Sequence, residues 1–323
     1  MKFSIIVPIY NSKETLKRAL SSIFAQTCRD FEVVIVDDCS TEPCDEIIAQ
    51  FDARQINYIK LNTNKGPGAA RQVALSEAKS DYILFVDADD ALYDNLVLLM
   101  YSKKIRDNDS PDVIRTMYRE VGQGYIKDIS TTQVYSLYGN AYRRQFLLDN
   151  GITIPPYRYC EDAIFNQIVN ESNPRTVVVK QVTYLYNVNQ NSICGTTDFK
   201  KESLAWLIRG NMHVFEHFID KNESRAKTLP CEFISYAFFY FQGLSNRLTD
   251  EETDALYELF RDWEAVTRAL RTMESDGRYY QWFLNNVQEG RRRALWYVPS
   301  FIEKIIFYDF AQRILGREWR KDA

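Results

Sequence analysis

Three carboxylates follow a short apolar run at residues 82–86, which is rich in β-forming side chains. Asp87, Asp89 and Asp90 stand so close in sequence that their charges repel one another and resist removal from water. A hard cation such as Mg²⁺ or Mn²⁺ would share this charge, because both ions prefer carboxylate and phosphate oxygens. The alternative is a solvated turn in which Asp90 caps a helix over 91–105.

Acids recur at two other places where a structural element is expected to end or begin. Asp38 closes a second apolar run, 31–38, and Glu161 with Asp162 opens a helical pattern that continues to Glu171. Carboxylates there can accept hydrogen bonds from a ligand or take a proton from a substrate. The alternative for Glu161 and Asp162 is structural, since acids in the first turn of a helix are favoured by its dipole.

The elements that would position these acids alternate between strand and helix. Apolar β-rich runs predict strands, and segments with a helical period lie between them. This alternation is typical of βαβ units with a parallel sheet, whose ligands bind beyond the carboxyl ends of the strands. The sequence therefore predicts an α/β fold. The expected strands are 4–11, 31–38, 56–62 and 82–86, and the expected helices are 13–26, 44–51 and 69–78, the first capped by Asn11 or Ser12.

A glycine-containing turn, Asn64 to Gly68, precedes the third of these helices. It is not the GxGxxG fingerprint, which belongs after the first strand, and the sequence contains no GxxxxGK[ST] loop. The turn still places backbone N–H groups at a helix start, where phosphate binds readily. Arg71, in the first turn of that helix, would add a positive charge.

Beyond residue 112 the pattern is mixed, and beyond about residue 198 it becomes helical. We expect a mostly parallel sheet flanked by helices over 1–200, with a nucleotide-binding-type half at 1–105 and a second half at 106–200. A C-terminal helical region follows at 201–323. The later strands are expected at 113–121, 124–130 and 176–186. A loop running into a helix is expected over 159–171, with Glu161 and Asp162 at the start of the helix, and the other later helices are expected at 144–149, 201–220, 230–246, 251–274, 278–288 and 300–315.

Composition narrows the function classes. The chain has 323 residues, 46% of them apolar, which is typical of a globular protein with a proper core. A formal net charge of −4 gives no general attraction to nucleic acid. The six cysteines form no CxxC pair, and the N-terminus has no signal-peptide pattern. No window is apolar enough to span a bilayer, so the sequence predicts a reduced, cytoplasmic protein.

Taken together, the motifs resemble those of bacterial-type inverting family 2 glycosyltransferases, which have the GT-A fold. Seven pieces occur in the family's order between about residues 3 and 195. Two positions depart from the pattern, since Cys39 stands where Gly is usual and Asn140 where many relatives have Lys. The QxxRW motif of processive synthases is absent, which favours addition of one sugar. The pieces are SIIVPIYN, VVIVDDCST, NKGPGAARQVAL, YILFVDADD, GNAYRRQFL, YCEDAIFN and YLYNVNQNSI.

The resemblance implies an enzyme of the hexosyltransferase type that uses a nucleoside diphosphate sugar, with a UDP-sugar favoured. Pro8, Ile9 and Tyr10 would line the base pocket, with Tyr10 stacking on the base. Asp38 would accept a hydrogen bond from the base, and Arg71 would meet the diphosphate.

The resemblance also implies roles for the remaining acids. Asp87, with Ala88, would approach the ribose, and Asp89 would bind Mn²⁺ or Mg²⁺. Asp162 would be the general base that deprotonates the acceptor hydroxyl, while Glu161 would orient the acceptor or its loop.

The resemblance makes 106–200 the acceptor half. The acceptor implied is a glycan, a lipid-linked carrier or a cell-surface polymer, as in polysaccharide biosynthesis. One alternative is transfer to a protein or a modified nucleic acid, and another is a non-catalytic sugar-nucleotide-binding protein. The tail 291–323 is basic and rich in aromatic residues, so it could contact the inner face of a membrane or pack on the domain or a second subunit. His213 and His217 lie four residues apart, which suits ordinary packing or a histidine that completes the Asp89 site.

Overall fold

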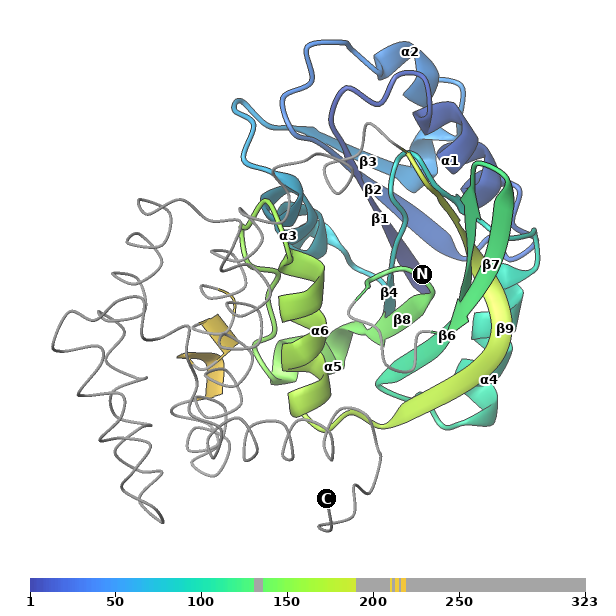
Figure 1. Ribbon diagram of the computed structural model, residues 1–323, viewed down its shortest axis with the longest axis vertical. Helices are drawn as coiled ribbons and strands as arrows, with labels where there is room; N and C mark the ends of the chain where they lie inside the picture. The colour runs from blue at the N-terminus through green and yellow to red at the C-terminus, as the bar shows by residue number, and fades with distance from the viewer. Residues whose placement is uncertain (131–135, 190–209, 211–212, 215, 219–323) are drawn as a thin grey trace, which may run out of the picture. The chain divides into compact units, whose positions relative to one another are not determined.

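The computed structural model describes residues 1–130, 136–189, 210, 213–214 and 216–218 (Figure 1). The chain folds as two compact units, Met1–Phe199 and Lys200–Ala323. Among the helices in the described part of the chain, none is both long and apolar enough to cross a bilayer. Residues 210, 213–214 and 216–218 are helical, within the helix expected over 201–220, and the helices expected beyond residue 220 and the tail 291–323 lie outside the described residues.

Four parallel strands form the first half of the sheet, in the order β3-β2-β1-β4. Helices link them in sequence, as the alternating pattern predicts. Nearly all residues of β1, β2 and β4 are buried, which explains their continuous apolar runs. The elements are β1 (Phe3–Ile9), α1 (Leu16–Phe24), β2 (Phe31–Asp37), α2 (Asp45–Ile48), the short 3₁₀ helix η1 (Ala53–Gln55), β3 (Ile56–Lys60), α3 (Pro67–Glu77) and β4 (Tyr82–Phe85).

The second half continues the same sheet in mixed directions, in the order β4-β8-β6-β9-β5, with β7 paired to β6. β8 is antiparallel to both β4 and β6, and the long, curved β9 runs parallel to β6 (Figure 1). The elements are β5 (Ala91–Leu92), α4 (Val97–Asp107), β6 (Val113–Gly122), β7 (Tyr125–Ser130), β8 (Asn140–Arg143), α5 (Arg144–Asp149), α6 (Glu161–Glu171) and β9 (Thr176–Asn187).

One large apolar core lies between the sheet and the helices α1 and α4. The face of β1 that carries Phe3, Ile5 and Val7 belongs to this core together with residues of both helices. In α1 the buried residues recur at helical spacing: Leu16, Ala19, Leu20 and Ile23. Burial of this stripe fixes the helix against the sheet, and so fixes the strand ends that carry the acids.

The prediction of a helix over 91–105 is wrong for the first residues of that range. Ala91–Leu92 is a short strand that pairs antiparallel with β9, and α4 begins only at Val97. Asp90 therefore caps no helix, and its carboxylate instead accepts hydrogen bonds from Tyr184 and Asn187. The pairing with β9 outweighs the local helical pattern, and it buries both residues of the strand.

The caps expected for the first helix are also wrong. α1 begins at Leu16, and its N-cap residue, Thr15, makes no capping bond through its side chain. The Asn11 side chain accepts hydrogen bonds from the backbone N–H and hydroxyl of Thr41 instead, and so holds the loop after β2. Asn11 is lost as a cap because a tertiary contact takes its side chain, and the Ser12 hydroxyl bonds to the backbone of Tyr10 instead.

Candidate functional site

The carboxyl ends of β1 and β2 place Tyr10 and Asp38 at one edge of the sheet. Ile9 pairs with Asp37 in the parallel register, and the backbone N–H of Asp38 donates to the Ile9 carbonyl at 2.8 Å. The Tyr10 ring is 49% exposed and Pro8 is partly exposed, whereas the Ile9 side chain lies in the core. Tyr10 and Pro8 are thus free to meet a planar ligand, and Ile9 could contact one only through its backbone.

The two acids at the end of β2 have different tasks. Asp37 is fully buried and accepts from the Ser40 backbone N–H at 2.7 Å, which shapes the loop after the strand. Asp38 accepts the backbone N–H groups of Lys65 and Gly66 at 2.8 and 2.7 Å, one on each carboxylate oxygen. Asp38 therefore ties the strand end to the turn that precedes α3.

The residue after the paired acids, Cys39, has a left-handed backbone with a φ of 64°. Glycine adopts this conformation without steric cost, whereas a residue with a Cβ does not. This explains why glycine is usual there in the family that the sequence resembles, and why Cys39 leaves the local shape intact at some cost in stability.

Arg71 links the nucleotide-side acids to the acids of α6. Its Nη2 donates to an Asp87 oxygen at 2.6 Å, and its Nη1 forms an ion pair with Glu161. Burial alone would lower the pKa of Arg71, but the charges of Asp87 and Glu161 raise it above its usual value. The buried Nε has no hydrogen-bond partner in the described part of the protein. Arg71 thus fixes two carboxylates that are 74 residues apart in sequence.

Glu161 and Asp162 form an acidic pair in the first turn of α6. Glu161 is buried and Asp162 is partly exposed, and the left-handed Cys160 turns the chain into the helix. Burial raises the pKa of both carboxyl groups, and nearby Arg71 opposes the rise. One Asp162 oxygen accepts from the Ala163 backbone at 2.8 Å. A carboxylate with a raised pKa, partly exposed beside a charged cluster, has the properties of a general base.

The turn after β4 is held by residues from β9 and α1. The Tyr184 hydroxyl donates to Asp90 at 2.7 Å and accepts the backbone N–H of Asp87 at 3.1 Å. Asn187 donates through its backbone to Asp90 and through its side chain to the Asp89 carbonyl, which also accepts from Arg18. This turn is therefore shaped by side chains far away in sequence.

Burial and the repulsion among its acids govern the charge state of the turn, and the bonds from Tyr184 and Asn187 to Asp90 oppose them. Burial, together with the charges of Asp87 and Asp89, raises the pKa of Asp90 to about 8. Burial and Asp87 also raise the pKa of Asp89, although Arg18 and the Asn189 side chain oppose this. Three ionised carboxylates are thus disfavoured in this turn unless a cation shares their charge.

That charge imbalance fits a divalent cation. Asp87 and Asp89 are both partly exposed, and Ala88 between them packs into the core, which directs the two acids away from it. The described residues contain no group of three His, Cys, Asp or Glu side chains arranged around an ion. Mg²⁺ is commonly held by one or two carboxylates plus the phosphates of a substrate, so a two-carboxylate set is sufficient.

The close approach of the loop before α6 to the backbone of α3 explains why residue 68 is a glycine. A Cβ at this position would lie 2.3 Å from the Pro155 carbonyl oxygen and 2.6 Å from that of Tyr157. The Gly68 N–H also donates to Tyr157 at 3.2 Å, so the loop before α6 packs directly on the first turn of α3. This contact brings Arg71 and Glu161 within reach of each other.

Replacing Gly68 by alanine is expected to lower the free energy of unfolding by about 1–3 kcal/mol through overpacking. The usual gain in helix propensity would act in the opposite direction. Thermal unfolding of the variant measures the effect, with Glu77→Ala, an exposed residue of the same helix, as the control that should change little. If both variants unfold with the wild-type midpoint, the backbone approach at Gly68 does not constrain the fold.

The structure thus brings most of the expected site residues to one edge of the sheet, and it adds four that the sequence interpretation missed. Tyr184, Asn187 and Arg18 hold the acidic turn, and Tyr138 stacks on Tyr184 with ring centroids 5.0 Å apart. The motif YLYNVNQNSI contains the first two, but only the fold shows what they contact. His213 belongs to the second unit, so a histidine that completes the Asp89 site stays a prediction.

Known proteins are similar to this chain over more than half of its length. The family model described as glycosyl transferase family 2 matches residues 4–168, just over half of the chain. The poly(ribitol-phosphate) beta-N-acetylglucosaminyltransferase TarS of Staphylococcus aureus is 33% identical over 204 residues, which cover 58% of this chain and 35% of TarS. A poly(ribitol-phosphate) beta-glucosyltransferase of Bacillus spizizenii is 28% identical over 210 residues, covering 59% and 33%. The chain thus spans about a third of the length of these curated relatives.

A solved structure also resembles this one. The crystal structure of S. aureus TarS 1–349 in complex with UDP-GlcNAc has a TM-score of 0.72 and 24% sequence identity, and the match covers 94% of this chain and 92% of that one. This likeness shows a shared fold, so the GT-A fold expected from the sequence is confirmed.

Proposed function

Since the chain belongs to glycosyl transferase family 2, we propose that it moves one sugar from a UDP-sugar to a hydroxyl of a polyol-phosphate polymer of the cell surface, with inversion at the anomeric carbon. Two relatives that are 33% and 28% identical are named for transfer of N-acetylglucosamine or glucose to poly(ribitol-phosphate), which supports this class of acceptor. The chain spans only part of those relatives, so the proposal concerns the chemistry of this domain.

One observation supports the proposal above all others. Arg71 joins Asp87, at the nucleotide edge of the sheet, to Glu161, and Asp162 follows directly in the same helix turn. A group with the properties of a general base therefore lies beside the edge where α/β sheets bind nucleotides. This is the arrangement that direct displacement of a nucleoside diphosphate needs.

Donor recognition is assigned to the ends of β1 and β2. The exposed Tyr10 ring would stack on the base, and Pro8 would complete the pocket wall. Asp38 keeps lone pairs beyond the two N–H groups that it accepts, so it could also accept the N–H of a uracil ring. Arg71 has N–H groups beyond its two ion pairs, and its contact with the diphosphate stays a prediction.

The acidic turn is assigned to a divalent cation, Mn²⁺ or Mg²⁺. Asp89 would bind the ion, and Asp87 would share its charge near the ribose while it stays paired to Arg71. Such an ion would act as a Lewis acid that neutralises the leaving diphosphate. The Tyr184 and Asn187 contacts would keep both carboxylates in place before the donor arrives.

The transfer itself would depend on Asp162. Its carboxylate would take the proton from the acceptor hydroxyl as that oxygen bonds to the anomeric carbon. The bond from the anomeric carbon to the diphosphate oxygen would break in the same step, with the electron pair leaving on UDP. A single displacement of this kind inverts the anomeric carbon without a covalent sugar–enzyme intermediate.

The raised pKa of Asp162 predicts a specific pH dependence. A general base works only when it is deprotonated, so activity should rise with pH as Asp162 loses its proton. Because burial raises this pKa, the acidic limb of the kcat profile should lie above the ordinary aspartate range near 3.9. Measuring kcat from about pH 4 to 9 with donor and acceptor saturating checks this, and a limb at or below that ordinary value would contradict a general base with a raised pKa.

The expected location belongs to the same proposal. A cytoplasmic protein at the inner face of the membrane would meet both a sugar nucleotide and a growing polymer. Membrane contact or self-association through 291–323 stays a prediction, because that tail lies outside the described residues. Co-sedimentation of the full chain with anionic vesicles at low and high salt measures it directly.

A screen of sugar nucleotides by thermal unfolding, with and without Mn²⁺, tests the proposed function. A ligand that binds only the folded state raises stability by RT ln(1 + [L]/Kd), about 2.7 kcal/mol at 100 times Kd. UDP-sugars should raise the midpoint more with Mn²⁺ than without it, and more than GDP- or ADP-sugars do. Equal shifts for all nucleotides, or none, would contradict a site that reads uracil.

A further inference from the structure

A cavity of about 490 Å³ lies at the amino-terminal ends of β1 and β4, whereas the candidate site lies at their carboxyl ends. Its walls come from Lys2 before β1, the segment 79–82 between α3 and β4, the end of α4, Ser110, and the junction of β8 with α5 at 143–145. β1 has seven residues at roughly 3.3 Å each, so the two ends lie on the order of 20 Å apart. The cavity is therefore separate from the site described above.

Positive charge dominates the lining, although the whole chain is acidic. Five cations face one acid, Asp81. Two of the cations have an acidic partner, since Arg143 pairs with Asp112 and Arg106 with Asp107. The other three have no ion-pair partner in the part of the chain that the structure describes: Lys2, Lys79 and Arg144. These three cations exceed the one acid of the lining, and this excess of positive charge favours an anion.

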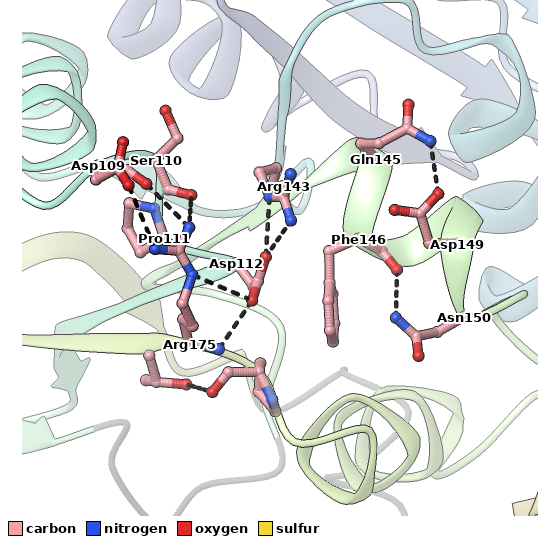
Figure 2. A network of polar contacts seen from close by, with 12 residues as sticks. Asp109, Ser110, Pro111, Asp112, Arg143, Gln145, Phe146, Asp149, Asn150 and Arg175 are labelled. Carbon is pink, nitrogen blue, oxygen red and sulfur yellow. Dashed lines mark hydrogen bonds and ion pairs between the residues drawn. The ribbon is translucent and has the colours of Figure 1, made fainter.

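One of the cations is held in a fixed position (Figure 2). Two guanidinium nitrogens of Arg143, Nε and Nη2, donate to the same Asp112 oxygen, at 2.9 and 2.5 Å. The other Asp112 oxygen accepts the backbone N–H of Arg175 at 2.9 Å, and Asp112 itself is buried. The guanidinium is thus oriented in advance, which reduces the entropy lost when it binds a ligand.

A second acid lies behind the lining but is already satisfied. Glu32 is buried, and one of its oxygens accepts from the Ser4 hydroxyl, the Lys79 backbone N–H and the Ser80 hydroxyl. Burial opposes ionisation, but these donors prevail and lower the pKa of Glu32. Its charge is therefore committed to shaping the 79–80 segment and leaves the Lys79 ammonium group without a bonded counter-ion.

The lining also indicates which kind of anion fits. Tyr82 is the aromatic residue of the lining, and it is buried with its hydroxyl donating to the Pro111 carbonyl at 2.7 Å. A nucleobase would lack an exposed ring to stack on, which disfavours nucleotides and single-stranded nucleic acid. Arginine and lysine with hydroxyl and amide groups, here Ser110 and Gln145, suit a phosphodiester flanked by polyol hydroxyls.

We propose that this cavity binds a phosphodiester of the polyol-phosphate acceptor chain, at a repeating unit remote from the hydroxyl that receives the sugar. The inference rests on the proposed function, because it takes its polymer from there. A chain anchored at the amino-terminal edge must run over the surface to the carboxyl-terminal edge, so only acceptors of several units can reach both places. The cavity thus acts as a length-sensing anchor that raises the affinity for long acceptors.

A double variant, Lys79→Gln with Arg144→Gln, tests the proposal in the full chain. The probe is a fluorescently labelled glycerol-phosphate oligomer of ten or more units, followed by anisotropy at low and high salt. Removal of two charged contacts is expected to weaken binding about tenfold or more, and high salt should weaken wild-type binding. The matched control, Lys127→Gln with Lys180→Gln, removes the same charge from exposed residues of β7 and β9 and should bind like the wild type.

Further experiments distinguish a polymer phosphodiester from free phosphate and from a lipid headgroup. They also distinguish failure of the cavity proposal from failure of the proposed function. In transfer assays, an acceptor of one or two units cannot reach both places, so its KM should be the same for the double variant and the wild type, whereas the KM of the long oligomer should rise. Inorganic phosphate that displaces the long oligomer at equal phosphate concentration would overturn the polymer assignment in favour of a free-phosphate site. Loss of binding to phosphatidylglycerol vesicles, with oligomer binding intact, would overturn it in favour of a lipid headgroup.

The donor site provides an independent readout. UDP-sugar stabilisation of the double variant should equal that of the wild type, because neither residue lies near the nucleotide edge. UDP-sugars could fail to stabilise the wild type while Lys79 and Arg144 are still needed to bind the oligomer. That result would contradict the proposed function but not the cavity proposal. Equal binding of the long oligomer by the wild type and the double variant would overturn the cavity.

Discussion

Replacing Asp162 by asparagine is expected to lower kcat by about 10²–10⁴-fold while donor binding stays nearly unchanged. The amide keeps the size of the side chain but cannot take a proton from the acceptor. One of its atoms can still accept the Ala163 N–H as Asp162 does, so the first turn of α6 should keep its shape. The loss should therefore appear in turnover and leave the thermal shift with the UDP-sugar in place.

The control for this variant is Asp149→Asn, an exposed acid on α5. It makes the same chemical change where no proton transfer is proposed, so its kcat should equal that of the wild type. Steady-state kinetics with saturating donor and acceptor measure both variants. Near-normal turnover of the Asp162 variant would mean that this carboxylate only complements the helix dipole.

Replacing Asp89 by alanine is expected to abolish the part of UDP-sugar binding that depends on Mn²⁺. In the proposed site its carboxylate and the diphosphate share one cation, so neither alone would hold it. The turn should survive, because Arg18 and Asn187 contact the Asp89 backbone carbonyl, which the variant retains. The loss would therefore be one of ligand binding and not of folding.

The raised pKa of Asp89 also predicts how the stability of the ligand-free variant changes. A carboxyl group whose pKa is raised by folding costs stability at pH values above its unfolded pKa. Near neutral pH the ligand-free variant should consequently be as stable as the wild type or more so. Thermal unfolding with UDP-sugar, with and without Mn²⁺ and with chelator, measures both effects, and Asp45→Ala on α2 serves as the control. A variant that keeps the full Mn²⁺-dependent shift would exclude Asp89 as a ligand.

The nucleotide-binding half could be predicted from sequence because its signals are local. β1, β2 and β4 are buried on both faces, so each is a continuous apolar run, and the acids at their ends mark the ligand edge without any knowledge of contacts. In the second half, two predictions that also rested on local signals were confirmed: the helix over 144–149 and the start of α6 at Glu161.

The contacts that shape the site could not be predicted, because they join residues far apart in the chain. Ala91 continues an apolar pattern that suits a helix, and only its pairing with Leu185 makes it a strand. Asp90 has the sequence context of a helix cap, and only the folded structure shows that it accepts a hydrogen bond from Tyr184 instead. Arg71 carries a charge that suits a diphosphate, and only the fold shows that Glu161 shares it.

The bonds from β9 to the acidic turn have a consequence for how the protein is made. Tyr184 and Asp90 are 94 residues apart, and Asn187 and Asp90 are 97 apart. A chain emerging from the ribosome can pair β1 to β4 while the residues that hold the turn after β4 are still unsynthesised. Closure of such long loops is slow relative to local folding, so the nascent chain passes through a stage with a nucleotide-type sheet and an unbraced acidic turn. Competence to bind a donor would then arise late, in one step, when β9 docks along β6.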